Sequence, residues 1–360
     1  MSALSCMTIM DRFPPEILSQ IFSFACTDGG YTGRSLSIVS KYVHKTSKPY
    51  KYNSIRLYDV RSAAAFASFL EKSSPDIVHS ILHLFVCNCG QNPDDQDMPY
   101  LPKASGTTSL RSRVSSGVSH LIPGRKRRQR RQMITESVDD LCRDGLTISA
   151  IIRVLKLVAP TLQTLTICFV SRSYTLPFLE HASPHPHFPR LPVLTELTVS
   201  YRAPLDSRFN YHFFCCPTSA ASLPSLRRLD ISAQAVDHHL PQTIFTHIAA
   251  IAPSLTHLCL SSRMTIDLRD ALAEAGDGLL PSTLRRICIL LDVCHRCTWG
   301  SKPSHCYRCH ILAMSSMDPR VVLLADPGGE VIGHKSCRTL VDEWQKRISG
   351  SEVFWEESDD

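Results

Sequence analysis

The sequence lacks the features that mark membrane-spanning proteins, secreted proteins and many enzymes. None of the apolar runs in its 360 residues approaches the roughly 18–20 residues that a transmembrane helix requires, and the run Ile81–Cys87 is too short. The N-terminus up to Glu16 has no basic start followed by an apolar stretch, so we expect no signal peptide. The chain also has no Gly-rich phosphate loop, no Gly-x-Ser-x-Gly elbow and no His-Glu-x-x-His helix. We therefore expect a protein that is not an enzyme and has no membrane partner.

What is present is the composition of an ordinary globular protein. Apolar residues make up 43% and charged residues 20%, which excludes a wholly disordered chain, a collagen and a long coiled coil. The length allows about two or three domains. Fifteen cysteines lie scattered through apolar segments, a usage typical of a reducing compartment. We therefore expect an intracellular protein, in the cytoplasm, the nucleus or both.

Positive charge is concentrated in one segment. Nine Lys and Arg and no acidic residue lie from Lys103 to Arg131, and the net charge of +6 becomes −3 when these nine are set aside. A solvated loop is the simplest interpretation, because the segment has few aromatic or β-branched residues to bury. A nuclear-import signal and a polyanion-binding site are the alternatives. The residues that would serve either role are Arg125, Lys126, Arg127, Arg128, Arg130 and Arg131.

An internal repeat runs along the chain. The pattern Leu-x-x-Leu-x-Ile/Val/Leu begins at 162, 194, 226, 255 and 284, with steps of 32, 32, 29 and 29 residues, and an earlier copy begins at Ile81. Each copy ends in a period-2 segment, which predicts a short strand, and Pro160, Pro224 and Pro253 precede several copies. Ile148, Ile152 and Leu155 recur at helical spacing before one copy. The pattern resembles irregular leucine-rich repeats, and an ordinary α/β domain is the alternative.

The N-terminal segment from Asp11 to Tyr52 follows a different pattern. Pro14 and Pro15 mark the start of an amphipathic helix, and Asp28-Gly29-Gly30 predicts its end. A second apolar-periodic segment contains Leu36, Val39, Tyr42 and Val43. Two helices of this size are too small to form a core of their own, so we expect them to need a partner surface or the adjoining repeats.

This segment resembles an F-box, and in particular the fungal F-box-like family. The resemblance covers about forty residues and rests on Phe13-Pro14-Pro15-Glu16-Ile17-Leu18-x-x-Ile21-Phe22 followed by Leu36-x-x-Val39-Ser40-Lys41. It implies the substrate receptor of an SCF-type cullin–RING ubiquitin ligase, in which the F-box docks on a Skp-type adaptor and the repeats recruit a protein substrate. The residues expected to contact the adaptor are Pro14, Pro15, Ile17, Leu18, Ile21, Phe22, Leu36 and Val39.

Two Cys-x-x-Cys pairs form a candidate zinc site near the C-terminus. Four thiolates can hold a tetrahedral zinc ion in a structural role, and His295, His305 and His310 are substitute ligands. A reduced, metal-free loop is the alternative, since the spacer is shorter than usual, and no cofactor is required for the expected function. The four candidate ligands are Cys294, Cys297, Cys306 and Cys309.

These observations predict an α/β repeat fold, an irregular leucine-rich-repeat-like solenoid, preceded by a small all-α F-box module. The expected division is a helical module at 1–52, a connector helix and first strand at 53–87, a basic and disordered insertion at 88–140, the repeat body at 141–292, a Cys-rich loop and C-terminal strand/helix cap at 293–348, and an acidic tail at 349–360. Two other functions remain open: a non-catalytic repeat scaffold whose first helices are only a cap, and a nuclear factor that binds nucleic acid through Arg125–Arg131.

Overall fold

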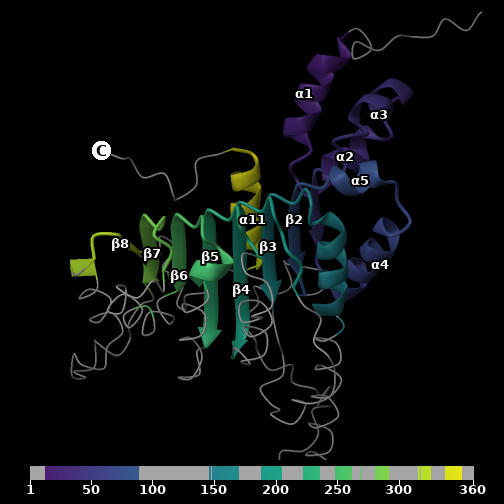
Figure 1. The fold of residues 1–360 in the computed structure, drawn as a ribbon. Helices are drawn as coiled ribbons and strands as arrows, with labels where there is room; N and C mark the ends of the chain where they lie inside the picture. Colours follow the sequence, from purple (N-terminus) through teal and green to yellow (C-terminus); the bar gives the residue numbers. More distant parts are fainter. Residues whose placement is uncertain are drawn as a thin grey trace, which may run out of the picture.

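The computed structural model describes residues 13–88, 146, 148–169, 188–204, 222–235, 248–261, 268, 280–291, 315–316, 318–325 and 337–350. Within these ranges the chain forms an α/β fold around one eight-stranded parallel sheet. The strands lie side by side in chain order, β1 to β8, with the N-terminal helices at the β1 end (Figure 1). The α/β class expected from the sequence is therefore confirmed.

The strands are short, from four residues in β1 to nine in β4. They are β1 Ser54–Leu57, β2 His83–Cys87, β3 Thr164–Phe169, β4 Glu196–Pro204, β5 Arg228–Ala235, β6 His257–Ser261, β7 Arg286–Leu291 and β8 Val321–Ala325. The helices with defined bounds are α1 Pro15–Ala25, α2 Tyr31–Leu36, α3 Lys41–Ser47, α4 Val60–Leu70, α5 Pro75–His79 and α11 Cys337–Ile348. Residues 148–158 are also helical.

The register of the sheet follows the sequence repeat. The second leucine of each copy stands beside its equivalent in the next strand, giving the row Leu84, Leu165, Leu197, Leu229, Leu258 and Ile287. The five regular copies form β3 to β7, and the copy that begins at Ile81 forms β2. Strand β1 was not predicted from the sequence, because Ser54-Ile55-Arg56-Leu57 lacks the leading leucine of the pattern.

From β1 to β7, each strand meets the next through the same backbone contact. The carbonyl that precedes one strand accepts hydrogen bonds from two consecutive amides at the start of the following strand, at N···O distances of 2.8–3.2 Å. The accepting carbonyls belong to Asn53, Leu82, Gln163, Thr195, Arg227 and Thr256. This recurring contact satisfies backbone groups that would otherwise be left without partners between neighbouring turns.

The two faces of the sheet bury different side chains. One face, here called the core face, carries Leu165, Ile167 and their equivalents, and packs against α4 and the helix of residues 148–158. The opposite face, here called the mixed face, carries Thr166, Cys168 and their equivalents. Apolar residues alternate with small and polar ones along each strand because successive side chains point to opposite faces.

Helix α11 packs on the mixed face over β2 and β3 (Figure 1). The sequence predicted a C-terminal strand and helix forming a cap at 293–348. The strand is β8, but α11 does not extend the sheet beyond β8 and instead lies on strands near the N-terminal end of the sheet. Its buried side Cys337, Leu340, Val341 and Trp344 contacts Phe85, Cys87 and Cys168, and this apolar contact fixes its position.

Candidate functional site

The N-terminal module contains three helices rather than the two that the sequence predicted. The apolar spacing from Leu36 to Val43 is shared between α2 and α3, because Ser40 starts a new helix. Its hydroxyl accepts a hydrogen bond from the Val43 amide at 3.1 Å, which satisfies one of the first amides of α3. The phenol of Tyr42 donates to the Phe13 carbonyl at 2.9 Å and ties α3 to the start of α1.

The module has a small core of its own. Leu18 and Phe22 of α1 meet Val43 of α3, and all three side chains are buried. Leu36, Tyr42 and Tyr50 are partly buried around them. The side chains at i and i+4 of α1 lie on the same side of that helix, so one side of α1 is used to fold the module.

Hydrogen bonds attach the module to the sheet. The Ser54 hydroxyl at the start of β1 donates to the Cys26 carbonyl at 2.8 Å and accepts from the Gly29 amide at 2.9 Å. Gly29 and Gly30 have positive φ angles of 79° and 91°, which glycine adopts without strain. Burial raises the pKa of the Cys26 thiol to about 11, so this cysteine is a neutral packing residue at the junction.

A second side of α1 leaves apolar residues in contact with solvent. Ile17, Ile21 and Phe24 follow one another at i, i+4 and i+7 and are 45%, 48% and 69% exposed. Phe13 precedes them at the same spacing and is also exposed. We call these four residues, Phe13, Ile17, Ile21 and Phe24, the α1 stripe. The spacing of Ile17, Ile21 and Phe24 places these three along one side of α1, and Phe13 lies just before the helix begins at Pro15.

Exposed apolar residues gather in this module more than in the rest of the described chain. Of the ten large apolar side chains that are exposed among the described residues, seven lie between Phe13 and Val39. Besides the α1 stripe they are Tyr31, Ile38 and Val39. Exposed apolar clusters on globular proteins are typical of interaction sites, so this surface is the candidate functional site.

The eight residues predicted to contact an adaptor fall into two groups. Pro14, Pro15, Ile17, Ile21 and Val39 are exposed, and Leu36 is partly buried. Leu18 and Phe22 are fully buried and present no surface to a partner in this fold. They fill the core of the module, because a helix that packs on α3 must turn one side inward.

Sequence reasoning also missed three exposed residues of this surface. Phe24, Tyr31 and Ile38 are the most exposed of the seven, and Ile38 is 87% exposed. The spacing of Phe24 from Ile17 was a usable signal, because i and i+7 lie on one side of a helix. Tyr31 and Ile38 continue the same seven-residue steps, but α1 ends at Ala25, so only the fold places these two residues at the surface.

A group of three cysteines on the mixed face could hold a metal ion. The Sγ atoms of Cys87, Cys168 and Cys337 all lie within 4.8 Å of one another, and all three residues are buried. The four cysteines that the sequence predicted as zinc ligands, Cys294, Cys297, Cys306 and Cys309, lie outside the described residues. The same holds for the basic segment Arg125–Arg131.

Aromatic and polar contacts surround this cysteine group. The rings of Phe85 and Trp344 are 5.7 Å apart, and the guanidinium of Arg347 donates to the Thr198 hydroxyl at 2.6 Å. Tyr58 packs on Phe85 at 6.4 Å, and the Arg56 guanidinium lies 4.9 Å from the centre of the Tyr58 ring. Burial raises the pKa of the Tyr58 phenol to about 12, and nearby thiol groups add to this effect.

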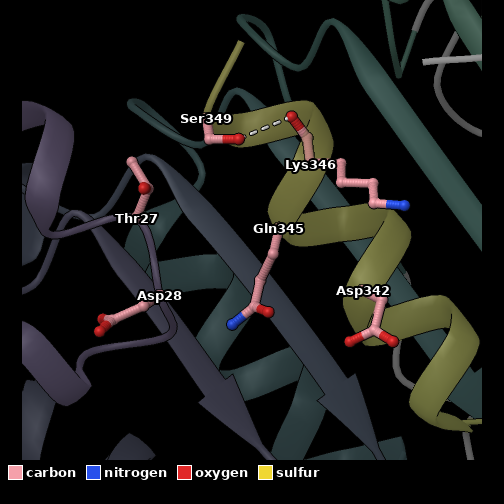
Figure 2. Close-up of a pocket in the computed structure, with 6 residues that line it drawn as sticks. All are labelled: Thr27, Asp28, Asp342, Gln345, Lys346 and Ser349. Atoms are coloured by element: carbon pink, nitrogen blue, oxygen red, sulfur yellow. Dashed lines mark hydrogen bonds between the residues drawn. The ribbon is translucent and has the colours of Figure 1, made fainter. Parts of the chain in front are cut away.

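A surface pocket of about 420 Å³ lies where the N-terminal module approaches α11. Figure 2 shows Gln345 of α11 reaching toward the loop that carries Thr27 and Asp28. The Asp28 carboxylate accepts hydrogen bonds from the amide and the hydroxyl of Thr32 in the first turn of α2. The pocket therefore lies at a junction between the N-terminal module and α11, and the Asp28 carboxylate in it is already bound by Thr32.

Comparisons with protein-family models, with curated proteins and with solved structures find no match for this chain. A search of the helices in the described part finds none that is both long and apolar enough to cross a membrane. A proposal for the function therefore rests on the geometry of the N-terminal module and of the sheet.

Proposed function

We propose that this protein is a substrate receptor of an SCF-type ubiquitin ligase, with its N-terminal module docking on a Skp-type adaptor. The observation that carries the proposal is the division of α1 into two sides. Leu18 and Phe22 complete the core of the module, while Ile17, Ile21 and Phe24 stay exposed. Because the module folds without the α1 stripe, that stripe is available for a partner.

The chemistry of the α1 stripe suits a groove on a helical partner. An amphipathic helix that binds in a groove uses apolar anchors at i, i+4 and i+7, which is the spacing of Ile17, Ile21 and Phe24. Large apolar residues at the centre of an interface contribute most of its affinity. The resemblance of Phe13–Phe22 to an F-box is the reason for choosing a Skp-type adaptor as that partner.

The body of the protein supports the second half of this role. Eight parallel strands in chain order, with steps of 29–32 residues between the regular copies and a repeated backbone contact, are typical of a leucine-rich-repeat-like solenoid. Such a body offers an extended surface for a protein substrate. Because α11 covers the mixed face over β2 and β3, we expect the substrate to contact other parts of the body.

The mechanism needs no catalytic group in this chain. A receptor that holds the substrate beside a ubiquitin-conjugating enzyme raises the effective concentration of the acceptor lysine. The module and the sheet are joined through Ser54, so a substrate on the body is held at a fixed distance from the adaptor. A cullin complex would supply the remaining subunits.

The test is co-expression of the whole chain with a Skp-type adaptor, followed by capture of the adaptor. We expect wild-type protein to be recovered and an Ile17→Asp/Ile21→Asp variant to be lost, because two carboxylates would be buried in an apolar groove. Val193→Asp is the matched control. Val193 is 38% exposed and lies in the repeat body, so its variant should be captured like the wild type.

Two results would contradict the proposal. If the wild-type chain is never captured, the α1 stripe serves a different partner and the chain is better described as a repeat scaffold. If the Ile17→Asp/Ile21→Asp variant unfolds, these residues belong to the core, as the scaffold interpretation requires. Circular dichroism of the purified variant distinguishes this second result from a loss of binding alone.

A further inference from the structure

The cysteine group on the mixed face brings together three distant parts of the chain. Cys87 and Cys168 are paired residues on the neighbouring strands β2 and β3, so their side chains point to the same face. Cys337 is the first residue of α11, which packs on these strands. The Sγ atoms of Cys337 and Cys87 are 3.1 Å apart, and no two of the three Sγ atoms are more than 4.8 Å apart.

These separations suit a metal ion bound by sulfur. With Zn–S bonds of about 2.3 Å, the sulfur atoms of a tetrahedral site lie about 3.8 Å apart. The 3.1 Å separation of Cys87 and Cys337 lies about 0.7 Å below that value, and no pair exceeds it by more than about 1 Å, so small shifts of the side chains would close the site. Thiolates select soft ions such as Zn²⁺ and Cu⁺ over Mg²⁺ and Ca²⁺, whose preferred ligands are oxygen atoms.

We propose that Cys87, Cys168 and Cys337 bind one zinc ion that fastens α11 to the sheet. Zn²⁺ with three thiolates has a net charge of −1, whereas Cu⁺ with three thiolates would have −2. Burial penalises the larger charge more strongly, and this favours zinc. Arg56 offers a compensating positive charge, because its guanidinium lies over Tyr58, which packs against the cysteine group.

The function of this zinc ion is structural. Cys87 and Cys337 are 250 residues apart in sequence, and a metal that closes so long a loop removes much of the entropy of the unfolded chain. The three thiols each release a proton as the zinc–sulfur bonds form, so binding tightens as the pH rises. Three protein ligands leave one coordination position for water or another donor. This proposal does not depend on the docking of the N-terminal module.

The test measures zinc content of the intact chain, purified under reducing conditions without chelators. Each of Cys87→Ser, Cys168→Ser and Cys337→Ser should lose about one zinc per chain relative to wild type. Cys259→Ser is the matched control, because Cys259 is equally buried and lies on the same face of the sheet in β6. It should retain all the zinc. Because each variant is compared with the wild type, any zinc bound at Cys294, Cys297, Cys306 and Cys309 contributes equally to both and does not affect the difference.

The result that overturns the proposal is an unchanged zinc content in all three variants, or a wild-type chain that contains no zinc and takes up none. A second measurement needs no variant, in case substitution prevents folding. Zinc added to the metal-free wild-type chain should slow alkylation of Cys87, Cys168 and Cys337 together, as read by peptide mass mapping, and leave Cys259 and Cys288 unchanged. Equal alkylation with and without zinc contradicts the proposal.

Discussion

At the scale of single residues, neighbours in α1 have opposite environments. Ile17 is 45% exposed whereas Leu18, the next residue, is fully buried, and Ile21 and Phe22 repeat this contrast. The sequence pattern identifies all four as apolar but does not assign them to core or surface. That assignment depends on where α3 packs, because Val43 of α3 selects the side of α1 that turns inward.

Gly33 of α2 offers a residue-scale test of how the module is assembled. A Cβ atom at this position would lie 2.6 Å from the Lys51 carbonyl oxygen and 2.9 Å from its Cα, too close for either to remain in place. We expect Gly33→Ala to destabilise the protein by about 1–3 kcal/mol, because the backbone must shift to admit the methyl group. Chemical denaturation measures the change. The control is Arg34→Ala, which changes an exposed neighbour in the same helix, and its free energy of unfolding should stay within about 0.5 kcal/mol of wild type. Equal stability of the two variants would show that α2 does not pack on Lys51.

His83 at the start of β2 predicts a dependence of stability on pH. Burial lowers the pKa of its imidazole to about 4, whereas an unfolded histidine has a pKa near 6.5. Between these values the unfolded chain binds a proton that the folded chain does not. The free energy of unfolding should therefore fall by about 3 kcal/mol in all as the pH drops from 6.5 to 4.

The variant that isolates this effect is His83→Asn, which keeps a polar group near the Thr164 hydroxyl that Nδ1 contacts at 3.0 Å. Urea unfolding at several pH values compares the two proteins. The variant should lose less stability than the wild type between pH 6.5 and pH 4. Parallel curves would mean that His83 is protonated equally in the folded and unfolded states.

At the scale of elements, the strands were predictable and α11 was not. The five regular copies of the repeat each form one strand. These strands were predictable because the alternation of apolar and polar residues lies within a few consecutive residues and can be read from the sequence. The helix of residues 148–158 has the predicted apolar stripe. The position of α11 depends on Phe85, Cys87 and Cys168, which are distant in sequence, and no local pattern links them to Cys337 and Trp344.

The contact of α11 with the sheet is tested by Trp344→Ala. Trp344 is buried against Phe85, and removing so large a buried side chain costs about 3–5 kcal/mol when the cavity does not collapse. Lys346→Ala, two residues away on the exposed side of α11, should have little effect. Thermal unfolding of both variants decides the question. Similar melting temperatures for the two would contradict the packing of α11 on the mixed face.

At the scale of the whole molecule, the arrangement separates a small helical module from an eight-stranded body. The sequence predicted this division because the module and the repeat have different apolar spacing. It did not predict β1, whose first residue Ser54 joins the two parts through hydrogen bonds to Cys26 and Gly29. It also did not predict the cysteine group, because its three members come from β2, β3 and α11 and form no motif in the sequence.

The most direct measurement of the proposed role is the affinity of the purified whole chain for a purified Skp-type adaptor, determined by titration calorimetry. We expect the Ile17→Asp/Ile21→Asp variant to bind at least about 30-fold more weakly, the loss typical of an apolar hot spot, with an unchanged melting temperature. Val193→Asp should bind like the wild type. Equal affinities for wild type and the double variant, or no binding by the wild-type chain, would contradict the assignment of the α1 stripe as the adaptor-docking surface.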